Sequence, residues 1–72
     1  MAETWKSIPA RDVELGDTVR TANGFVLYVS RIEEPFMGRP EMLAFIEDLP
    51  TRWLKAPAAL EAPIEVRVAS DG

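Results

Sequence analysis

The chain has 72 residues, a formal net charge of −4, and neither cysteine nor histidine. Its composition, 47% apolar and 28% charged, is typical of a folded globular protein, and its length suits one domain. The missing residue types exclude disulfides and the usual zinc sites. The negative charge disfavours duplex DNA as a ligand, because DNA binding depends on neutralising phosphates.

Nothing in the sequence indicates a membrane or a secreted protein. No run of ~20 apolar residues is present to span a bilayer, and the N-terminus lacks the basic and apolar regions of a signal peptide. We therefore expect a cytoplasmic protein. A core of this size supplies a net stability of roughly 3–5 kcal/mol, which leaves self-association open as a further source of stability.

The N-terminal part of the chain predicts an entry segment, a turn and a first strand. Residues 1–7 form a polar lead-in that carries Trp5 outside the expected sheet, and Pro9 keeps the residue before it extended. A turn is expected over residues 12–17, where a Gly-Asp pair supplies permissive backbone. The first strand follows over residues 18–21.

The pair Asn23-Gly24 is the strongest local signal, because a two-residue type I′ turn requires positive φ at both positions. It predicts a hairpin between the first strand and a second strand over residues 25–32. Residues 25–29 are apolar at every position, which predicts a central strand that is covered on both faces.

A loop is expected over residues 33–40, because two prolines and a glycine prevent regular structure there. Phe36 and Met37 at its tip either cover the core or face a partner, and we favour covering. Residues 41–49 fit either an amphipathic helix or a strand. We favour the strand, since an isolated hairpin needs further strands to be stable.

The remaining segments complete an antiparallel sheet. Residues 51–56 predict a fourth strand, and residues 57–61 predict one turn of 3-10 helix that begins at a proline. Residues 64–68 alternate apolar and charged side chains, which predicts a last strand with its apolar residues, Val68 included, facing the core. Residues 69–72 are expected to fray.

This order of five strands resembles the Src-homology-3-like (SH3-like) family of small β-barrels, in particular the single-barrel proteins of actinobacteria and their phages. Three stretches carry the resemblance, which covers about residues 9–68: Asp12-Val-Glu-Leu-Gly-Asp-Thr-Val19, Trp53-Leu-Lys-Ala-Pro-Ala58 and Pro63-Ile-Glu-Val-Arg-Val68. The resemblance implies an all-β, five-stranded antiparallel SH3-like barrel with a 3-10 turn before the last strand. Proteins of this kind mostly have no known activity, so the resemblance implies a fold and little else; a phage accessory protein that acts on a host component is one form of the protein-binding hypothesis given below.

Candidate catalytic groups are few. Without histidine or cysteine, acid–base chemistry falls to two carboxylate pairs, Glu33-Glu34 and Glu47-Asp48. Neighbours in a strand point to opposite faces, so Glu47 and Asp48 are not expected to converge on a substrate. The other pair is expected to be a solvated strand end. We therefore expect no enzyme activity and no cofactor.

A metal site is also not expected. Asp12, Glu14 and Asp17 are spaced at two and three residues, which brings three carboxylates into one short segment. The calcium-loop pattern needs more oxygen ligands and a glycine at a set position, and it is absent here. Turn chemistry accounts for these residues.

The remaining class is protein binding, and we expect a non-enzymatic module that binds a protein partner or a second copy of itself. The candidate residues are of the types enriched at interface centres, and they are Trp5, Phe36, Met37, Arg39 and Trp53. The structural alternative is that Trp5 and Phe36 cap the open ends of the barrel. Self-association through an unpaired strand edge would give a homo-oligomer.

A second hypothesis is binding of single-stranded nucleic acid. Small barrels hold single strands by stacking bases on aromatic side chains beside basic neighbours. The residues that would form such a face are Arg20, Arg31, Arg52, Lys55 and Trp53. Carboxylates interleaved with these residues favour cross-strand ion pairs as the simpler explanation.

Overall fold

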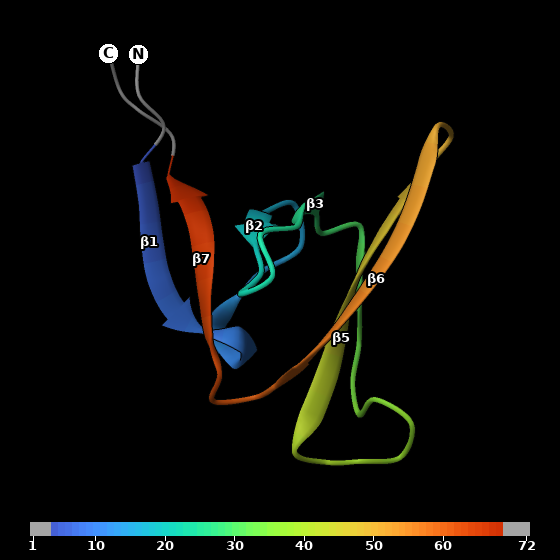
Figure 1. Cartoon of the computed structure of the whole chain (residues 1–72). Helices are drawn as coiled ribbons and strands as arrows, with labels where there is room; N and C mark the ends of the chain where they lie inside the picture. Colours follow the sequence, from blue (N-terminus) through green and yellow to red (C-terminus); the bar gives the residue numbers. More distant parts are fainter. Residues whose placement is uncertain (1–3, 69–72) are drawn as a thin grey trace.

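Seven strands form two antiparallel sheets in residues 4–68, which are the residues that the computed structural model describes (Figure 1). The larger sheet contains, in spatial order, β1 (Thr4–Pro9), β7 (Pro63–Val68), β2 (Thr18–Arg20) and β3 (Val26–Tyr28). The smaller sheet contains β4 (Arg31–Glu33), β5 (Met42–Leu49) and β6 (Arg52–Ala59). The all-β class and the antiparallel pairing are confirmed. The prediction of five strands is wrong, and the two sheets do not close into a barrel.

The chain passes from the larger to the smaller sheet between two adjacent residues, Val29 and Ser30. The amide of Val29 donates to Asp17 O at 2.8 Å, which ties it to the larger sheet. The amide of Ser30 donates to Ile46 O at 2.8 Å, and its Oγ accepts from the amide of Asp48 at 3.0 Å. The single strand expected over residues 25–32 is therefore two strands, β3 and β4, in different sheets.

The hairpin between β2 and β3 is confirmed, but its expected type I′ turn is wrong. The amide of Thr21 donates to Phe25 O at 2.8 Å, which leaves three residues in the loop instead of two. The amide of Gly24 donates back to Thr21 O at 2.9 Å. Gly24 has φ of 87°, a conformation that favours glycine, whereas Asn23 does not take positive φ. The loop is thus a turn followed by one left-handed glycine.

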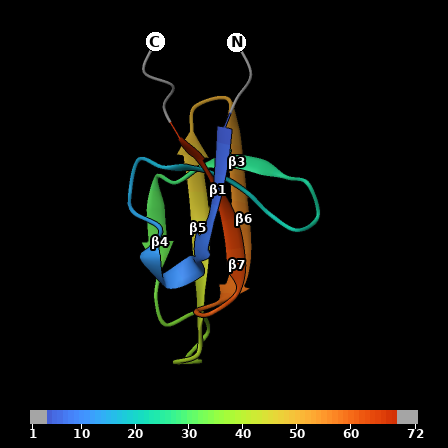
Figure 2. The same cartoon turned by 90° about the vertical axis from the view of Figure 1, so that its left-hand side faces the viewer.

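The core is centred on β5, which is buried on both faces over residues 43–47. The strand favoured over the helix for residues 41–49 is confirmed as β5. The larger sheet and the β5–β6 hairpin face each other across this core (Figures 1 and 2). The buried apolar residues that form the main cluster are Ala10, Val13, Val19, Leu27, Val29, Leu43, Phe45, Ile64 and Val66.

Two expectations about burial are wrong. The segment 25–29 was expected to be central, but β3 is an edge strand, and the side chains of Phe25, Val26 and Tyr28 are exposed. Val68 was expected to face the core and is exposed near the end of β7. Within the segment 25–29, only Leu27 and Val29 are buried in the core.

The N-terminal lead-in and the expected 3-10 turn are also corrected. Trp5 is a residue of the sheet and not of a lead-in, because β1 pairs with β7 along its whole length. The 3-10 helix is at Ala10–Asp12, where the Ala10 amide donates to Ala62 O at 2.9 Å, and β6 continues through Pro57 to its last residue. The fraying expected at residues 69–72 lies outside the described residues. Residues 4–68 contain no helix that is long and apolar enough to cross a membrane.

Candidate functional site

Glu47 is the only buried charged residue of the described core, and it closes one edge of the larger sheet. Its side chain is 1% exposed and points from β5 toward β3. Oε1 accepts from the backbone amide of Tyr28 at 2.6 Å and from Arg52 Nη2 at 2.9 Å, and Oε2 accepts from Arg52 Nε. Arg52 Nη2 also donates to Val26 O at 3.3 Å. We call Glu47 and Arg52 the edge clip, because they bond β3 where a neighbouring strand is missing.

The ionisation of Glu47 follows from these contacts. The hydrogen bond from Arg52 lowers the pKa of Glu47 below its usual value, burial opposes this shift, and the amide of Tyr28 adds to it. The carboxylate is therefore charged at neutral pH and fully engaged in structural bonds. Asp48 points to the other face and pairs with Arg31 at 3.5 Å, so the two adjacent carboxylates do not converge.

The long edge strand of the smaller sheet is β6, which pairs only with β5 among residues 4–68. On the other side of β5, the amide of Ser30 donates to Ile46 O, so the backbone groups of Ile46 point toward β4. Ile46 lies opposite Lys55 in the β5–β6 register. Backbone groups alternate in antiparallel pairs, so those of Trp53, Lys55 and Pro57 point away from β5. Pro57 fits this position because it has no N–H to pair.

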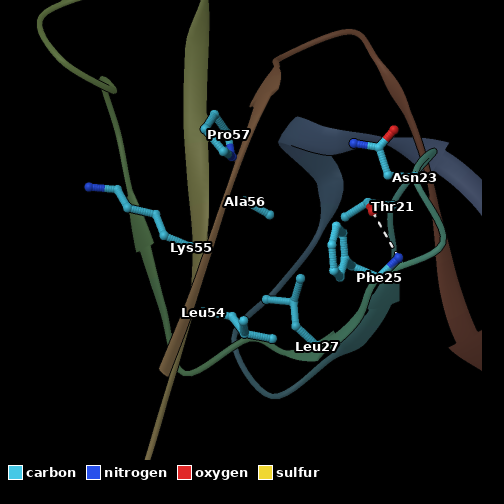
Figure 3. A pocket seen from close by; sticks show the side chains of 8 residues that line it. All are labelled: Thr21, Asn23, Phe25, Leu27, Leu54, Lys55, Ala56 and Pro57. Carbon is cyan, nitrogen blue, oxygen red and sulfur yellow. Dashed lines mark hydrogen bonds between the residues drawn. The ribbon is translucent and has the colours of Figure 1, made fainter. Parts of the chain in front are cut away.

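The space beside this edge is a seam between β6 and the β2–β3 hairpin (Figure 3). A hollow of about 230 Å³ lies there, lined mainly by apolar side chains; its walls are Thr21, Asn23, Phe25, Leu27, Leu54, Lys55, Ala56 and Pro57. A second hollow of about 270 Å³ shares four of these residues and continues along β6 toward the β6–β7 turn. We call the two hollows together the seam.

The lining of the seam is mainly apolar, and its one cation, Lys55, is paired elsewhere. Phe25 stands on the hairpin with its side chain 60% exposed and its ring directed toward β6, while Leu27 and Leu54 approach each other at one end (Figure 3). Lys55 Nζ is directed away from the hollow and pairs with Glu33 Oε1 at 3.0 Å. The hollow therefore offers apolar surface beside an unpaired strand edge.

The structure places the partner-binding candidates in three separate regions. Trp5 lies on the outer face of the larger sheet, where the guanidinium of Arg20 stacks 4.4 Å from its ring centroid. Phe36 is half-buried beneath Lys55, whose Nζ lies 4.9 Å from the ring centroid. Met37 is 79% exposed, so the expectation that it covers the core is wrong.

The two remaining candidates are also exposed, in different places. Arg39 lies in the loop that contains Met37, and its amide donates to Phe36 O at 2.9 Å. Trp53 is 55% exposed near the β5–β6 turn, and its backbone belongs to the free edge of β6. Of the five candidates, Trp53 is the one that adjoins the seam.

The cations of the nucleic-acid hypothesis do not gather on one face. Arg20 lies on the larger sheet, Arg31 and Lys55 lie on the outer face of the smaller sheet, and Arg52 belongs to the edge clip. Each of the four has a carboxylate partner: Arg20 with Glu65 at 2.8 Å, Arg31 with Asp48, Lys55 with Glu33, and Arg52 with Glu47. These pairs reduce the positive charge available for phosphates.

Two of the three N-terminal carboxylates have local partners: Asp12 lies 3.9 Å from Arg11 Nε, and Asp17 belongs to a turn with Glu14. Asp17 Oδ2 accepts from the amide of Glu14 at 2.9 Å, and the amide of Asp17 donates to Glu14 O at 3.2 Å. Within residues 4–68 no group of three acidic side chains is arranged to hold a metal ion.

Sequence reasoning missed the seam and the edge clip. Phe25 was assigned to a buried strand because residues 25–29 are apolar at every position, and nothing local indicates that β3 lies at an edge. The burial of Glu47 depends on Arg52, five residues later, and on the amide of Tyr28 in the other sheet. A scan against protein-family models and searches of curated proteins and solved structures find no match for the chain.

Proposed function

We propose that the protein is a non-enzymatic binding module that adds an extended segment of a protein partner to the free edge of β6. The observation that supports this proposal is the unpaired backbone of Trp53, Lys55 and Pro57 beside an apolar seam. A peptide in this position gains main-chain hydrogen bonds from the edge and side-chain contacts from the seam, which is the usual division of roles in strand addition.

The geometry restricts the chemistry of the partner. Side chains of an extended peptide alternate between two faces, so every second residue enters the seam and meets the exposed Phe25 or the partly buried Leu54. These positions favour apolar side chains. Like charges directly opposite each other destabilise a strand pair, so the position opposite Lys55 favours a neutral or acidic residue. The expected ligand is an extended segment with apolar residues at alternate positions and no lysine or arginine at its centre.

The test is a selection of peptides from a random display library against the immobilised protein, followed by amide chemical-shift mapping of the best binders. We expect the shifts to follow β6 and the β2–β3 hairpin, and the amides of Trp53 and Lys55 to gain protection from exchange. Replacing the exposed Phe25 by serine is expected to weaken binding by about tenfold or more, as for an interface hot spot.

Two further variants separate the edge from the rest of the surface. Lys55→Pro removes an amide that points to solvent, so it is expected to preserve the fold and abolish peptide binding. Leu15→Ser removes another exposed apolar side chain, outside the seam, and is expected to leave binding unchanged. Binders that map to another face, or a library that yields none, would contradict the proposal.

Three expectations from the sequence accompany this proposal. An SH3-like relationship fits a small antiparallel β domain that is left open along one seam, and a phage accessory protein acting on a host component fits a binding role. A cytoplasmic location stays a prediction. The nucleic-acid hypothesis is tested in the same titrations: binding of a labelled single-stranded oligonucleotide at low salt, where screening is weakest, would favour it over peptide binding.

A further inference from the structure

Besides β6, the described residues contain a second long free edge, β1, at the outer margin of the larger sheet (Figure 1). No strand within residues 4–68 pairs with it on the side away from β7. Pro9 lies opposite Pro63, and neither residue has an N–H, so this pair belongs to the non-bonded positions of the ladder. By alternation, the backbone groups of Trp5, Ser7 and Pro9 point outward.

The four sheet edges formed by residues 4–68 differ in what they can accept. The edge of β3 is occupied by the edge clip, and β4 has only three residues. The edge of β6 carries Lys55 at its centre, so two copies paired about that residue would place two lysines opposite each other, which disfavours self-pairing in the central register. The outward positions of β1 carry an aromatic residue, a serine and a proline, with no charge among them.

We propose that β1 pairs antiparallel with β1 of a second copy about a twofold axis at Ser7, forming one continuous eight-stranded sheet. In this register Ser7 lies opposite Ser7 of the second copy, and each amide donates to the other carbonyl. The amide of Trp5 donates to the carbonyl of Pro9 in the second copy, and the reverse. The lack of an N–H in Pro9 removes two further bonds, so four hydrogen bonds remain.

Side-chain contacts select this register over its nearest alternative. With the twofold axis at Ser7, Lys6 lies opposite Ile8 of the second copy, and Trp5 lies beside the ring of Pro9. A twofold axis at Lys6 would place two lysines directly opposite each other, in a closely spaced pair that like charges destabilise. The pairing at Ser7 is isologous, as a twofold dimer requires.

The size of the contact sets the expected strength. Pairing through one six-residue strand buries less than the ~1,200 Å² that marks the lower end of stable interfaces. We therefore expect a reversible dimer with a dissociation constant on the order of 100 μM. Both copies carry a net charge of −4, so added salt screens their repulsion and is expected to strengthen the dimer.

The experiment is sedimentation velocity of the full chain from ~10 μM to ~1 mM, a range that brackets the expected dissociation constant. The informative pair of variants is Ser7→Ala, which keeps the central amide, and Ser7→Pro, which removes it. The amide points to solvent in the monomer, so Ser7→Pro is expected to keep the fold, as circular dichroism and thermal unfolding check. We expect Ser7→Ala to dimerise like the unaltered protein and Ser7→Pro to raise the dissociation constant by about tenfold or more.

The same substitution at the other edge serves as the matched control. Lys55→Pro is expected to leave the dimer intact and to abolish peptide binding at the seam. Ser7→Pro is expected to weaken the dimer and to leave peptide binding unchanged. In a mixed-label sample, a contact between the Hα of Lys6 and the Hα of Ile8 in the second copy establishes the register. A monomer throughout the concentration range, or a dimer that responds to Lys55→Pro and not to Ser7→Pro, would overturn the proposal.

Discussion

Replacing Glu47 by alanine is expected to lower the free energy of unfolding by roughly 2–3 kcal/mol, because it removes charge-assisted hydrogen bonds from a buried acceptor. The carboxylate bonds the amide of Tyr28 in one sheet and the guanidinium of Arg52 in the other. Its loss leaves β3 without an acceptor for that amide and opens a void between the sheets. Against a net stability of roughly 3–5 kcal/mol for a domain of this size, the change is large, and urea unfolding followed by tryptophan fluorescence measures it.

The neighbouring residue provides the control for this variant. Asp48→Ala removes an exposed carboxylate whose partner, Arg31, is 3.5 Å away and also exposed. We therefore expect the free energy of unfolding to change by no more than about 0.5 kcal/mol. Glu47→Gln keeps an oxygen acceptor for the amide of Tyr28. Its loss of unfolding free energy is therefore expected to lie between those of Glu47→Ala and Asp48→Ala. Equal stability of the Glu47→Ala and Asp48→Ala variants would show that the edge clip does not hold the sheets together.

Replacing Arg52 by alanine is expected to reverse the direction of the pKa shift of Glu47. With Arg52 present, its hydrogen bond is the dominant influence and the pKa lies below the usual 4.5. Without it, burial is the larger of the remaining influences and the bond from Tyr28 the smaller, so the pKa rises above that value. Carbon-13 NMR of the Glu47 carboxyl carbon measures the two values directly.

The sign of the effect on stability follows from linkage. In the unaltered protein the depressed pKa of Glu47 contributes stability above pH 4.5, and this contribution is lost as the pH falls through the folded pKa. In Arg52→Ala the raised pKa stabilises the protonated form, and that stability is lost as the pH rises through the folded pKa. The variant is therefore expected to be much less stable than the unaltered protein at neutral pH, with a difference that narrows on acidification.

A second arginine variant controls for the general loss of a cation. Arg31→Ala removes an exposed guanidinium that does not contact Glu47, so the pKa of Glu47 is expected to stay below its usual value. If the pKa of Glu47 also stayed low in Arg52→Ala, the burial and pairing described for the edge clip would be wrong.

The elements that the sequence predicted correctly are those whose patterns are local. In β7, Ile64 and Val66 alternate with Glu65 and Arg67, and this period of two was sufficient to identify a strand with one buried face. The hairpin after β2 was identified from Asn23-Gly24 for a similar reason, although the glycine alone takes positive φ. These features are determined by a few adjacent residues, and both are present in the structure.

The features that were missed depend on contacts between distant residues. Ser30 divides an apparently continuous strand because it bonds Ile46 and Asp48, which lie in the opposite sheet. Pro57 was expected to begin a 3-10 turn, but an edge strand tolerates a proline whose nitrogen faces solvent. That β6 is an edge follows from the order of all the strands and cannot be recognised from its own residues.

The passage from one sheet to the other at Val29 and Ser30 has a consequence for how the molecule opens. These consecutive amides are hydrogen-bonded to different sheets. Opening of either sheet therefore displaces the residue next to the first hydrogen bond of the other sheet. The slowest-exchanging amides of both halves are therefore expected to report one shared opening free energy, as in a single cooperative unit. The protein would then lose both layers together, with no half-folded species in which one layer survives alone.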